Sequence, residues 1–371
     1  MKIAFVYDAV YPFVKGGAEK RLYEIGKRLS GKGHEVHWYG IKWWEEEDII
    51  ERDGIILHGV CKPMPLYTKT GRRSIKEALW FSLKLLRPLF KERFDLIDCQ
   101  QFPYLPCFST KLVSVMKKTP LIITWHEVWS DYWYQYLGWK GFFGKNIEKL
   151  CSRLTDKNIV VSETTRNLLV ELGVRKENIF VVPNGVDIKE IQEIEPSPEK
   201  FDVLFAGRLI KDKNVDVLIR SVNNTGIKTC IIGDGPEKRK LMKMADENVT
   251  FLPFQKHSKL LAYMKSSQVF VSPSTREGFG IAMLESLACG VPVITVTHPR
   301  NAALDLIGDG GNGFVVGLSG EEITGKIKLI LGDEELRERM SKKAVDSARE
   351  CGWDGIAEKI NKEYEDIANT S

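Results

Sequence analysis

Residues 268–295 read as a strand, a turn, a helix and a second strand in direct succession. Residues 268–272 are a strand-length apolar run, and residues 281–289 have the composition of a helix. Gly290 suits the helix C-cap, and residues 291–295 form the next apolar run. Two strands joined by a helix form a βαβ unit, which requires a parallel sheet covered by helices. This segment therefore constrains the chain to an α/β fold.

A glycine-rich turn joins the first strand of this unit to its helix. The turn sets the backbone N–H groups of Phe279, Gly280 and Ile281 at the helix N-terminus, where they attract anions or sugar hydroxyls. Glu277 in the turn and Glu285 one turn into the helix could bind hydroxyls of a polyol. A plain βαβ crossover with two solvated glutamates is the alternative at this point, because one such turn is a weak signal.

Length and composition limit the class of protein. A chain of 371 residues, 43% apolar and 28% charged, fits two soluble α/β domains. Its apolar runs are too short to span a bilayer, and its first residues read as a strand rather than a signal peptide. Seven scattered cysteines without C-x-x-C spacing predict reduced thiols, neither disulfides nor a zinc site. We therefore expect a cytoplasmic protein.

The first half of the chain repeats the strand–helix rhythm. Strands are expected at residues 2–7, 35–39, 54–58, 96–98, 121–124 and 157–161, with a long helix at residues 74–92. Gly16 and Gly17 follow the first strand and open a helix, which makes a turn suited to anions. The turn lacks the dinucleotide G-x-G-x-x-G pattern, so NAD is a poor candidate. A tight turn that merely needs glycine is the alternative.

Charge and aromatic residues are unevenly distributed. Residues 1–185 carry a net charge of +8 and residues 186–371 a net charge of −4, which favours an anionic partner for the first half unless it is ordinary scatter. The 74–92 helix is basic and amphipathic, with Arg72 just before it, so it suits either an anionic membrane or the sheet. Residues 128–143 are rich in aromatics and could line an acceptor site, meet a membrane or pack in the core.

The second half restarts the alternation after an acidic linker at residues 188–200. Strands are expected at residues 202–206, 228–232 and 249–254, a helix at residues 215–222, and a final helix at residues 353–368. Arg208 follows one strand end, and Lys213 precedes the next helix. Two such cations can clamp a diphosphate, although isolated surface charges are equally compatible. Gly233 opens a further turn at a strand end.

The chain resembles the family-4 retaining glycosyltransferases (glycosyl transferase group 1). Residues 273–293 match the family frame "PS…EGFG…E…A.G.PV", and four further motifs follow the family order, including "PNGVD" at residues 183–187. The resemblance spans essentially the whole chain. It implies a GT-B fold: two Rossmann-like, doubly wound parallel-sheet domains facing a central cleft. An acceptor domain, residues 1–187, would be completed by a C-terminal helix, residues 354–371, that crosses back to it, and residues 188–353 would form the donor domain.

The resemblance also implies roles for individual residues. Gly16 and Gly17 would lie beside the donor diphosphate and the acceptor, His126 over the transferred sugar, and Gly233 against the nucleoside. Arg208 and Lys213 would neutralise the leaving diphosphate together with the amides of Phe279, Gly280 and Ile281. Glu277 would bind sugar hydroxyls near C3, and Glu285 the ribose. Two positions depart from the family: Pro253 replaces a common glycine near the expected base contacts at 253–257, and only Asp305 could stand in for a usual downstream acid.

The activity implied by the resemblance is retaining transfer of a hexose from a UDP- or GDP-linked donor to an acceptor hydroxyl. We expect no metal or other cofactor, no nucleic acid partner and no covalent enzyme nucleophile. The acceptor would be a carbohydrate or lipid-linked, with contact to an anionic membrane as a further expectation. A sugar-nucleotide epimerase, a phosphorylase, for which no pyridoxal lysine is identified, and a non-catalytic sugar-nucleotide-binding protein are the alternatives.

Overall fold

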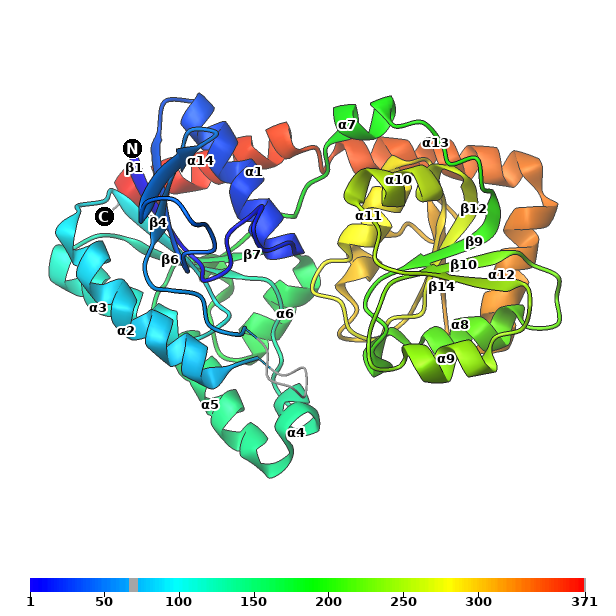
Figure 1. Ribbon diagram of the computed structural model, residues 1–371, viewed down its shortest axis with the longest axis horizontal. Coiled ribbons are helices and arrows are strands. Elements are labelled where there is room, and N and C mark those ends of the chain that lie inside the picture. Colours follow the sequence, from blue (N-terminus) through cyan, green and yellow to red (C-terminus); the bar gives the residue numbers. More distant parts are fainter. Residues whose placement is uncertain (67–72, 370–371) are drawn as a thin grey trace. The chain divides into compact units, whose positions relative to one another are not determined.

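The computed structural model describes residues 1–66 and 73–369, and its internal contacts divide the chain into two compact units (Figure 1). The first unit comprises Met1–Pro183 together with Trp353–Ser371, and the second comprises Asn184–Gly352. The boundaries expected from the sequence lie a few residues further along the chain at the first crossing and one residue further at the second. Arg72, named above with the basic helix, lies outside the described residues.

The first unit is built on a sheet whose described strands run in the order β3-β4-β2-β1-β5-β6-β7-β8. These strands are β1 (Lys2–Val6), β2 (Glu35–Gly40), β3 (Ile49–Arg52), β4 (Ile55–Gly59), β5 (Leu96–Gln100), β6 (Leu121–Trp125), β7 (Asn158–Val160) and β8 (Ile179–Val181). Neighbouring strands are parallel, except that β3 pairs with β4 in the antiparallel sense.

The antiparallel edge strand β3 is a local departure from the expected βαβ rhythm. Asp53 and Gly54 join β3 to β4, and both have positive φ, of 50° and 79°. Two consecutive left-handed residues form the tight turn that favours a hairpin. The charged strand itself, Ile-Ile-Glu-Arg, gives little periodic signal, which is why the sequence did not indicate it.

Helices cover both faces of this sheet. They are α1 (Gly17–Gly31), α2 (Ile75–Lys91), α3 (Leu105–Lys117), α4 (Tyr132–Leu137), α5 (Gly141–Cys151), α6 (Glu163–Glu171) and α14 (Trp353–Asn369), with short 3-10 turns η1 (Gly138–Lys140) and η2 (Lys176–Asn178). Strand β1 shows why two layers are needed. Ile3 and Phe5 pack into the core that α1 and α14 complete, whereas Ala4 and Val6 pack into the core of α2 and α3. This alternation produces the doubly wound arrangement.

The second unit contains a parallel sheet in the order β11-β10-β9-β12-β13-β14. Its strands are β9 (Phe201–Ala206), β10 (Thr229–Ile232), β11 (Val249–Leu252), β12 (Ser267–Ser272), β13 (Val293–Val296) and β14 (Gly313–Val316). Its helices are α7 (Ile188–Glu193), α8 (Val215–Val222), α9 (Lys238–Met244), α10 (His257–Lys265), α11 (Ile281–Ala288), α12 (Gly320–Gly332) and α13 (Glu334–Arg349), with η3 (Lys211–Lys213) and η4 (Ala302–Leu306). The chain order reverses between β9 and β12, which places the β9 and β12 loops next to each other at the topological switch point.

The expected linker at residues 188–200 begins instead as the helix α7. The Asp187 side chain accepts a hydrogen bond from the Glu190 N–H at 3.0 Å, which supplies the N-cap. The acidic composition and two prolines of this stretch masked the cap in the sequence. Among the described residues, no helix combines the length and hydrophobicity needed to cross a membrane.

Candidate functional site

The turn between β12 and α11 is anchored to the loop that follows β13. The Glu277 N–H donates to the Arg300 carbonyl at 2.9 Å, and the Ala302 N–H donates to the Glu277 carbonyl at 3.0 Å. Gly280 is the N-cap of α11 with φ of 94°, and an added Cβ would lie 2.8 Å from the Ala303 Cβ. Glycine is therefore required at position 280 by the backbone itself.

The α11 N-terminus presents backbone donors as the sequence predicted. The helix begins at Ile281, so its first N–H groups have no acceptor within the helix. The Phe279 side chain is buried, which leaves the backbone of the turn rather than its ring to meet a ligand. The turn can therefore receive an anion or a hydroxyl.

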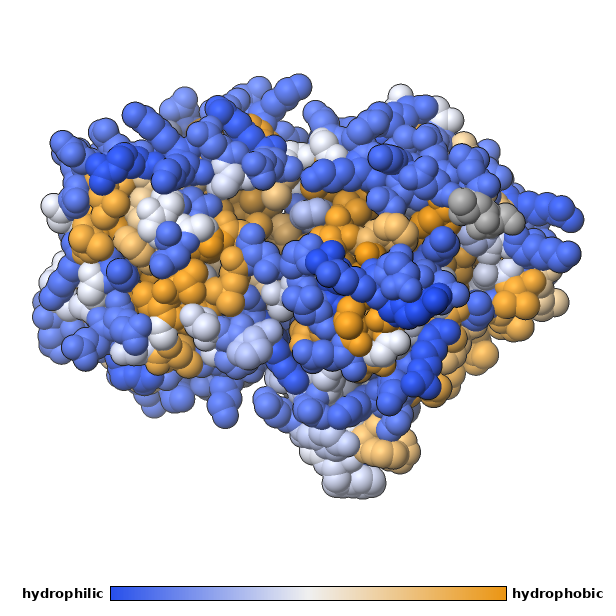
Figure 2. All heavy atoms as spheres, turned by 180° about the vertical axis from the view of Figure 1, so that it is seen from behind, coloured by the Kyte–Doolittle hydropathy of each residue, from blue (hydrophilic) through white to orange (hydrophobic). Residues whose placement is uncertain are grey.

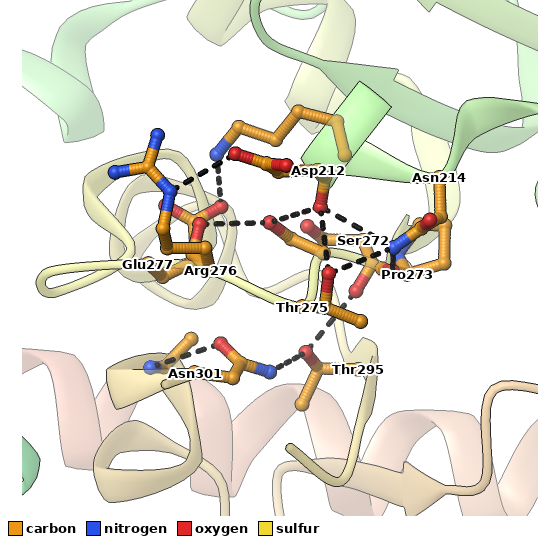
Figure 3. Close-up of polar contacts among 12 residues, drawn as sticks. Asp212, Asn214, Ser272, Pro273, Thr275, Arg276, Glu277, Thr295 and Asn301 are labelled. Carbon is orange, nitrogen blue, oxygen red and sulfur yellow. Dashed lines mark hydrogen bonds and ion pairs between the residues drawn. The ribbon is translucent and has the colours of Figure 1, made fainter. Parts of the chain in front are cut away.

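Lys213 and Glu277 form an ion pair, and both side chains are more than four-fifths buried. Arg276 beside them bonds through Nε to the Asp212 carboxylate at 3.0 Å. The Asp212 carbonyl accepts the Thr275 N–H at 2.9 Å, so the η3 loop and the β12–α11 loop are joined by backbone and side chains (Figure 3). The cation predicted to meet a diphosphate thus lies directly against the carboxylate predicted to meet a sugar.

Two asparagines that the sequence did not single out fix these loops. Asn214, in the left-handed conformation, donates through Nδ2 to the Pro273 carbonyl at 3.0 Å and to the Thr275 hydroxyl at 3.2 Å. Asn301 is buried and donates to the Thr295 hydroxyl at 3.0 Å (Figure 3). Both side chains replace backbone partners in irregular loops. Asn214 occupied a helix-start position in the sequence, and that was its only visible signal.

The loops after β9 and β10 interlock. The Leu209 N–H donates to the Asp234 carbonyl at 2.8 Å, and a Cβ on Gly233 would come within 1.9 Å of the Gly207 carbonyl oxygen. Gly233 is therefore needed for the close approach of two backbones. Arg208 lies on this interlocked turn at the end of β9, with an exposed side chain.

Glu285 lies on α11 with its side chain nearly buried, and its Oε1 is 2.7 Å from the Nε2 of His257. The sequence marked residues 253–257 for contacts with a base, but gave His257 no individual role. The neighbouring Phe254 is 75% exposed. The structure therefore connects this segment to the predicted ribose carboxylate through a histidine.

In the first unit, α1 begins at Gly17 with Gly16 as an extended N-cap. A Cβ on Gly16 would meet the Glu19 carboxylate at 2.3 Å. Burial raises the pKa of Glu19 to about 7. The carboxyl group beside Gly16, that of Glu19, is therefore close to half-ionised at neutral pH.

His126 follows β6 directly, as predicted for a group at the C-terminal end of a parallel strand. Its Nε2 lies 2.8 Å from the Gln100 Oε1, and its backbone N–H donates to the Gln101 Oε1 at 3.0 Å. Burial, with a smaller contribution from Arg21, lowers the pKa of His126 to about 3. The ring is therefore neutral, and a Nε2–H donating to Gln100 leaves Nδ1 as an acceptor. Gln100 ends the buried strand β5 and Gln101 follows it directly, which was their only sequence signal.

A cluster of acids lies at the end of β1. Asp8 is fully buried and pairs with Arg73, whose guanidinium also lies 3.9 Å from the Glu77 carboxylate. Burial raises the pKa of Asp8, and burial followed by the Asp8 charge raises the pKa of Glu77 to about 8. The Arg73 guanidinium thus lies close to two buried carboxyl groups, those of Asp8 and Glu77.

Comparison with known families gives a match to both halves of the chain. Residues 15–190 match the family described as Glycosyltransferase Family 4, and residues 187–346 match Glycosyl transferases group 1. The chain belongs to the family-4 glycosyltransferases.

This family-4 glycosyltransferase is 28% identical over 232 residues to an uncharacterized glycosyltransferase of Methanocaldococcus jannaschii. The alignment covers 61% of this chain and 64% of the relative, which is less than two thirds of the relative's length. The relationship supports the family without assigning a substrate.

Solved structures show that the family member has the GT-B fold, as predicted. Sucrose-phosphate synthase from Thermosynechococcus elongatus matches with a TM-score of 0.83 at 18% identity over 100% of both chains. Anabaena HepE, in complex with UDP and glucose, matches with a TM-score of 0.76 at 20% identity over 98% of both chains.

The predicted site residues of this glycosyltransferase fall into two sets. Gly16, Gly17 and His126 belong to the first unit. The second unit holds the remainder, namely Arg208, Lys213, Gly233, Glu277, Phe279, Gly280, Ile281 and Glu285. Within the second set the structure brings Lys213 and Glu277 together. Asp305, suggested as a stand-in acid, lies in η4 with an exposed side chain.

Proposed function

We propose that this protein is a retaining glycosyltransferase that moves a hexose from a UDP- or GDP-linked donor to an acceptor hydroxyl in the synthesis of a glycan or glycoconjugate. The observation that carries the proposal is the buried Lys213–Glu277 pair beside the α11 N-terminus. In this pair the cation proposed to bind phosphate contacts the carboxylate proposed to bind sugar hydroxyls. The complex of HepE with UDP and glucose, in a protein of the same fold, is consistent with it.

The second unit supplies the charge stabilisation. An arriving diphosphate would share the Lys213 ammonium with Glu277, while Arg208 and the α11 amides bind the remaining phosphate oxygens. Negative charge grows on the diphosphate as it leaves, so these donors stabilise the transition state more than the ground state. We propose that they replace a divalent metal in this role.

The sugar and the acceptor complete the reaction. The bond between the sugar C1 and the diphosphate oxygen breaks, and the acceptor oxygen bonds to C1 on the same face, while its proton passes to the leaving phosphate. Glu277 would hold the sugar hydroxyls, and the neutral His126 would contact the transferred sugar without adding charge. No enzyme side chain forms a covalent intermediate in this scheme.

The first experiment measures binding and slow hydrolysis of UDP-, GDP- and ADP-sugars in EDTA. We expect one donor to bind and to hydrolyse with net retention. Arg208→Ala, Lys213→Ala and Glu277→Ala should each lower turnover by about 100-fold or more. Lys211→Ala is the matched control, because Lys211 lies in the same 3-10 turn with an exposed side chain. Failure of every donor to bind, or variants as active as wild type, would exclude the proposal.

The same assays separate the alternatives. An epimerase would convert the donor sugar to its epimer with no acceptor present. A non-catalytic binding protein would bind the donor, with neither hydrolysis nor transfer to any acceptor in a panel. Both outcomes differ from the slow retaining hydrolysis expected of a transferase.

We further propose that the acceptor is lipid-linked and that the first unit contacts an anionic membrane. Helices α2 and α3 pack against each other, and each exposes large apolar side chains. The α2 stripe is Ile75, Leu79, Trp80 and Leu83, and the α3 stripe is Leu112, Val115 and Met116. Orange atoms appear beside blue ones along the right-hand edge of Figure 2, where these helices lie.

The charges of these helices favour an anionic surface. Helices α2 to α5 carry two acidic residues, Glu77 and Glu148, and both are buried. The exposed charges of α2 are cations, namely Lys76, Lys84, Arg87 and Lys91. The aromatic segment 128–143 divides: Trp129 and Trp133 are core, whereas the last aromatics, up to Phe143, are exposed. An apolar stripe with cationic borders is the pattern of an interfacial helix.

Vesicle sedimentation tests the membrane proposal. We expect binding to phosphatidylglycerol vesicles that weakens with salt, and little binding to phosphatidylcholine. Leu83→Glu should reduce binding about tenfold or more. Leu329→Glu, at an exposed leucine of α12 in the second unit, should have no effect. Equal binding to both vesicle types, or no loss in Leu83→Glu, would contradict the proposal.

A further inference from the structure

His257 lies between two carboxylates from different helices of the second unit. Its Nε2 is 2.7 Å from the Oε1 of Glu285 on α11, and its Nδ1 is 3.4 Å from the Oε1 of Glu190 on α7. The histidine itself is the first residue of α10. One imidazole thus joins three helices.

The contact with Glu285 restricts that carboxylate. The Glu285 side chain is only 9% exposed, so it has little room for alternative rotamers. The Nε2–H of His257 donates a hydrogen bond to Oε1 of Glu285. The second carboxylate oxygen, Oε2, therefore remains for a ligand. A carboxylate held at one oxygen presents the other in a fixed direction, which is what bonding a pair of adjacent hydroxyls requires.

Glu190 faces the ring from its other side, with its Oε1 3.4 Å from Nδ1. A neutral imidazole has one N–H and can donate to one carboxylate, whereas a protonated ring donates to both. With Nε2–H on Glu285, the Nδ1 contact with Glu190 becomes a second hydrogen bond when the ring is protonated. The backbone N–H of Glu190 donates to the Asp187 side chain at 3.0 Å, which fixes the start of α7, while the Glu190 side chain is 43% exposed.

We propose that His257 is a positioning residue for the nucleotide ribose, because it holds the Glu285 carboxylate in the direction that receives the ribose hydroxyls. The inference rests on the proposed function, in which Glu285 binds the ribose. It adds a residue that acts through Glu285 rather than on the sugar or the phosphates.

The test compares nucleotides that have and lack the ribose hydroxyls. Isothermal titration would give the Kd of UDP, GDP and ADP and of their 2′,3′-dideoxy analogues for the 371-residue chain. For the nucleotide that binds, we expect wild type to prefer the ribose form by about tenfold or more, since a hydrogen bond to a buried carboxylate is lost in the analogue. His257→Ala and Glu285→Gln should each bring the ratio of the dideoxy Kd to the ribose Kd close to one. The double variant should lower this ratio no further.

Two variants separate positioning from folding. His257→Gln keeps an N–H donor and should restore part of the preference. Lys259→Ala, an exposed residue on the same helix, should leave the ratio unchanged. A merely structural role would weaken the ribose and dideoxy forms equally and leave their ratio intact, and that result would overturn the inference.

The outcomes also distinguish this inference from the proposed function. If wild type binds a nucleotide with a ratio near one, or if His257→Ala keeps the wild-type ratio, the inference is wrong while donor binding stands. If wild type binds none of the three nucleotides, the proposed function and the inference fail together.

Discussion

At the scale of single residues, His126 shows how burial sets the chemistry of a site. The pKa of about 3 keeps the ring uncharged throughout the range in which most enzymes work. Its Nε2 and backbone N–H are both fixed by glutamines that end β5 or directly follow it. The uncharged ring can therefore accept a hydrogen bond through Nδ1.

The lowered pKa of His126 predicts a loss of stability in acid. The unfolded side chain takes up a proton below about pH 6.5, whereas the folded one does not until about pH 3. The contribution of the uncharged His126 ring to the free energy of unfolding is therefore present above pH 6.5 and is lost as the pH falls. Between pH 6.5 and 4.5 this amounts to at most about 2 kcal/mol of the free energy of unfolding.

Urea unfolding at several pH values checks this expectation. His126→Gln should show a smaller loss of stability between pH 6.5 and 4.5 than wild type. Proton NMR of the His126 ring should show no titration between pH 5 and 8. A titration midpoint near 6.5 would contradict the assignment of a neutral buried ring.

The individual site residues were accessible to sequence reasoning to different degrees. Glu277, Glu285 and Lys213 belong to sequence motifs, and their roles stay predictions. The side chains that they contact could not be predicted from the sequence, because the Lys213–Glu277 and His257–Glu285 contacts join loops and helices that are distant in the chain. Such contacts depend on which strand ends become neighbours at a sheet edge, and local periodicity carries no information about that.

At the scale of elements, α2 combines three demands in one helix. Ser74 caps it, its Phe81 and Leu85 side chains complete the core, and its outer stripe remains apolar. The sequence bounds of residues 74–92 lie within one residue of the helix at each end. The buried Glu77 was not explained by any pattern, because its acid partner Asp8 lies at the far end of a strand 69 positions earlier.

The Glu77 carboxyl predicts a loss of stability as the pH rises. Its folded pKa of about 8 lies above the ordinary value near 4.5, so the folded protein retains a proton that the unfolded chain has released. The contribution of the protonated Glu77 carboxyl to the free energy of unfolding is present below about pH 4.5 and is lost towards pH 8. The facing groups are Asp8, whose charge adds to the effect of burial, and Arg73, which opposes it.

Differential scanning calorimetry at pH 5, 6.5 and 8 tests this expectation. Glu77→Gln should have a flatter pH dependence and should gain at most about 3.5 kcal/mol relative to wild type between pH 5 and 8. Glu46→Gln removes an exposed carboxylate and should follow wild type. A Glu77→Gln curve parallel to wild type would exclude a protonated Glu77.

Short elements were harder to predict than long ones. Helix α8 has the bounds expected from its apolar periodicity, whereas β3 and α7 were missed. Four residues of a charged edge strand and six of an acidic helix contain at most two periods of the strand or helix pattern. Their caps and turns, rather than their composition, decide their structure.

At the scale of the whole molecule, the chain leaves the first unit after Pro183 and returns to it at Trp353. Arg21 is buried on α1 and donates to the carbonyls of Val182, at 2.9 Å, and Pro183. Tyr364 on α14 donates its hydroxyl to the buried carboxylate of Asp98 in β5. Both chain crossings are thus fixed to the first unit by neighbouring buried polar groups, since the Arg21 charge acts on Asp98 and Tyr364.

Tyr364→Phe should therefore destabilise the first unit by about 1–3 kcal/mol. Burial raises the pKa of Asp98, and Tyr364 is the strongest of the groups that oppose this rise. The variant leaves Asp98 with the Thr124 hydroxyl at 2.8 Å and the Gln100 amide at 3.1 Å, so the buried carboxyl group loses one of its donors.

Hydrogen exchange with urea unfolding would locate this effect. Faster exchange should appear in α14 and β5, whereas amides of the second unit should exchange as in wild type. Tyr134→Phe, at an exposed tyrosine of α4, controls for loss of a hydroxyl. Unchanged stability in Tyr364→Phe would mean that apolar packing by Ile356 and Ile360 alone holds the returning helix. A loss confined to the first unit would instead show that the buried hydroxyl secures the second crossing of the chain.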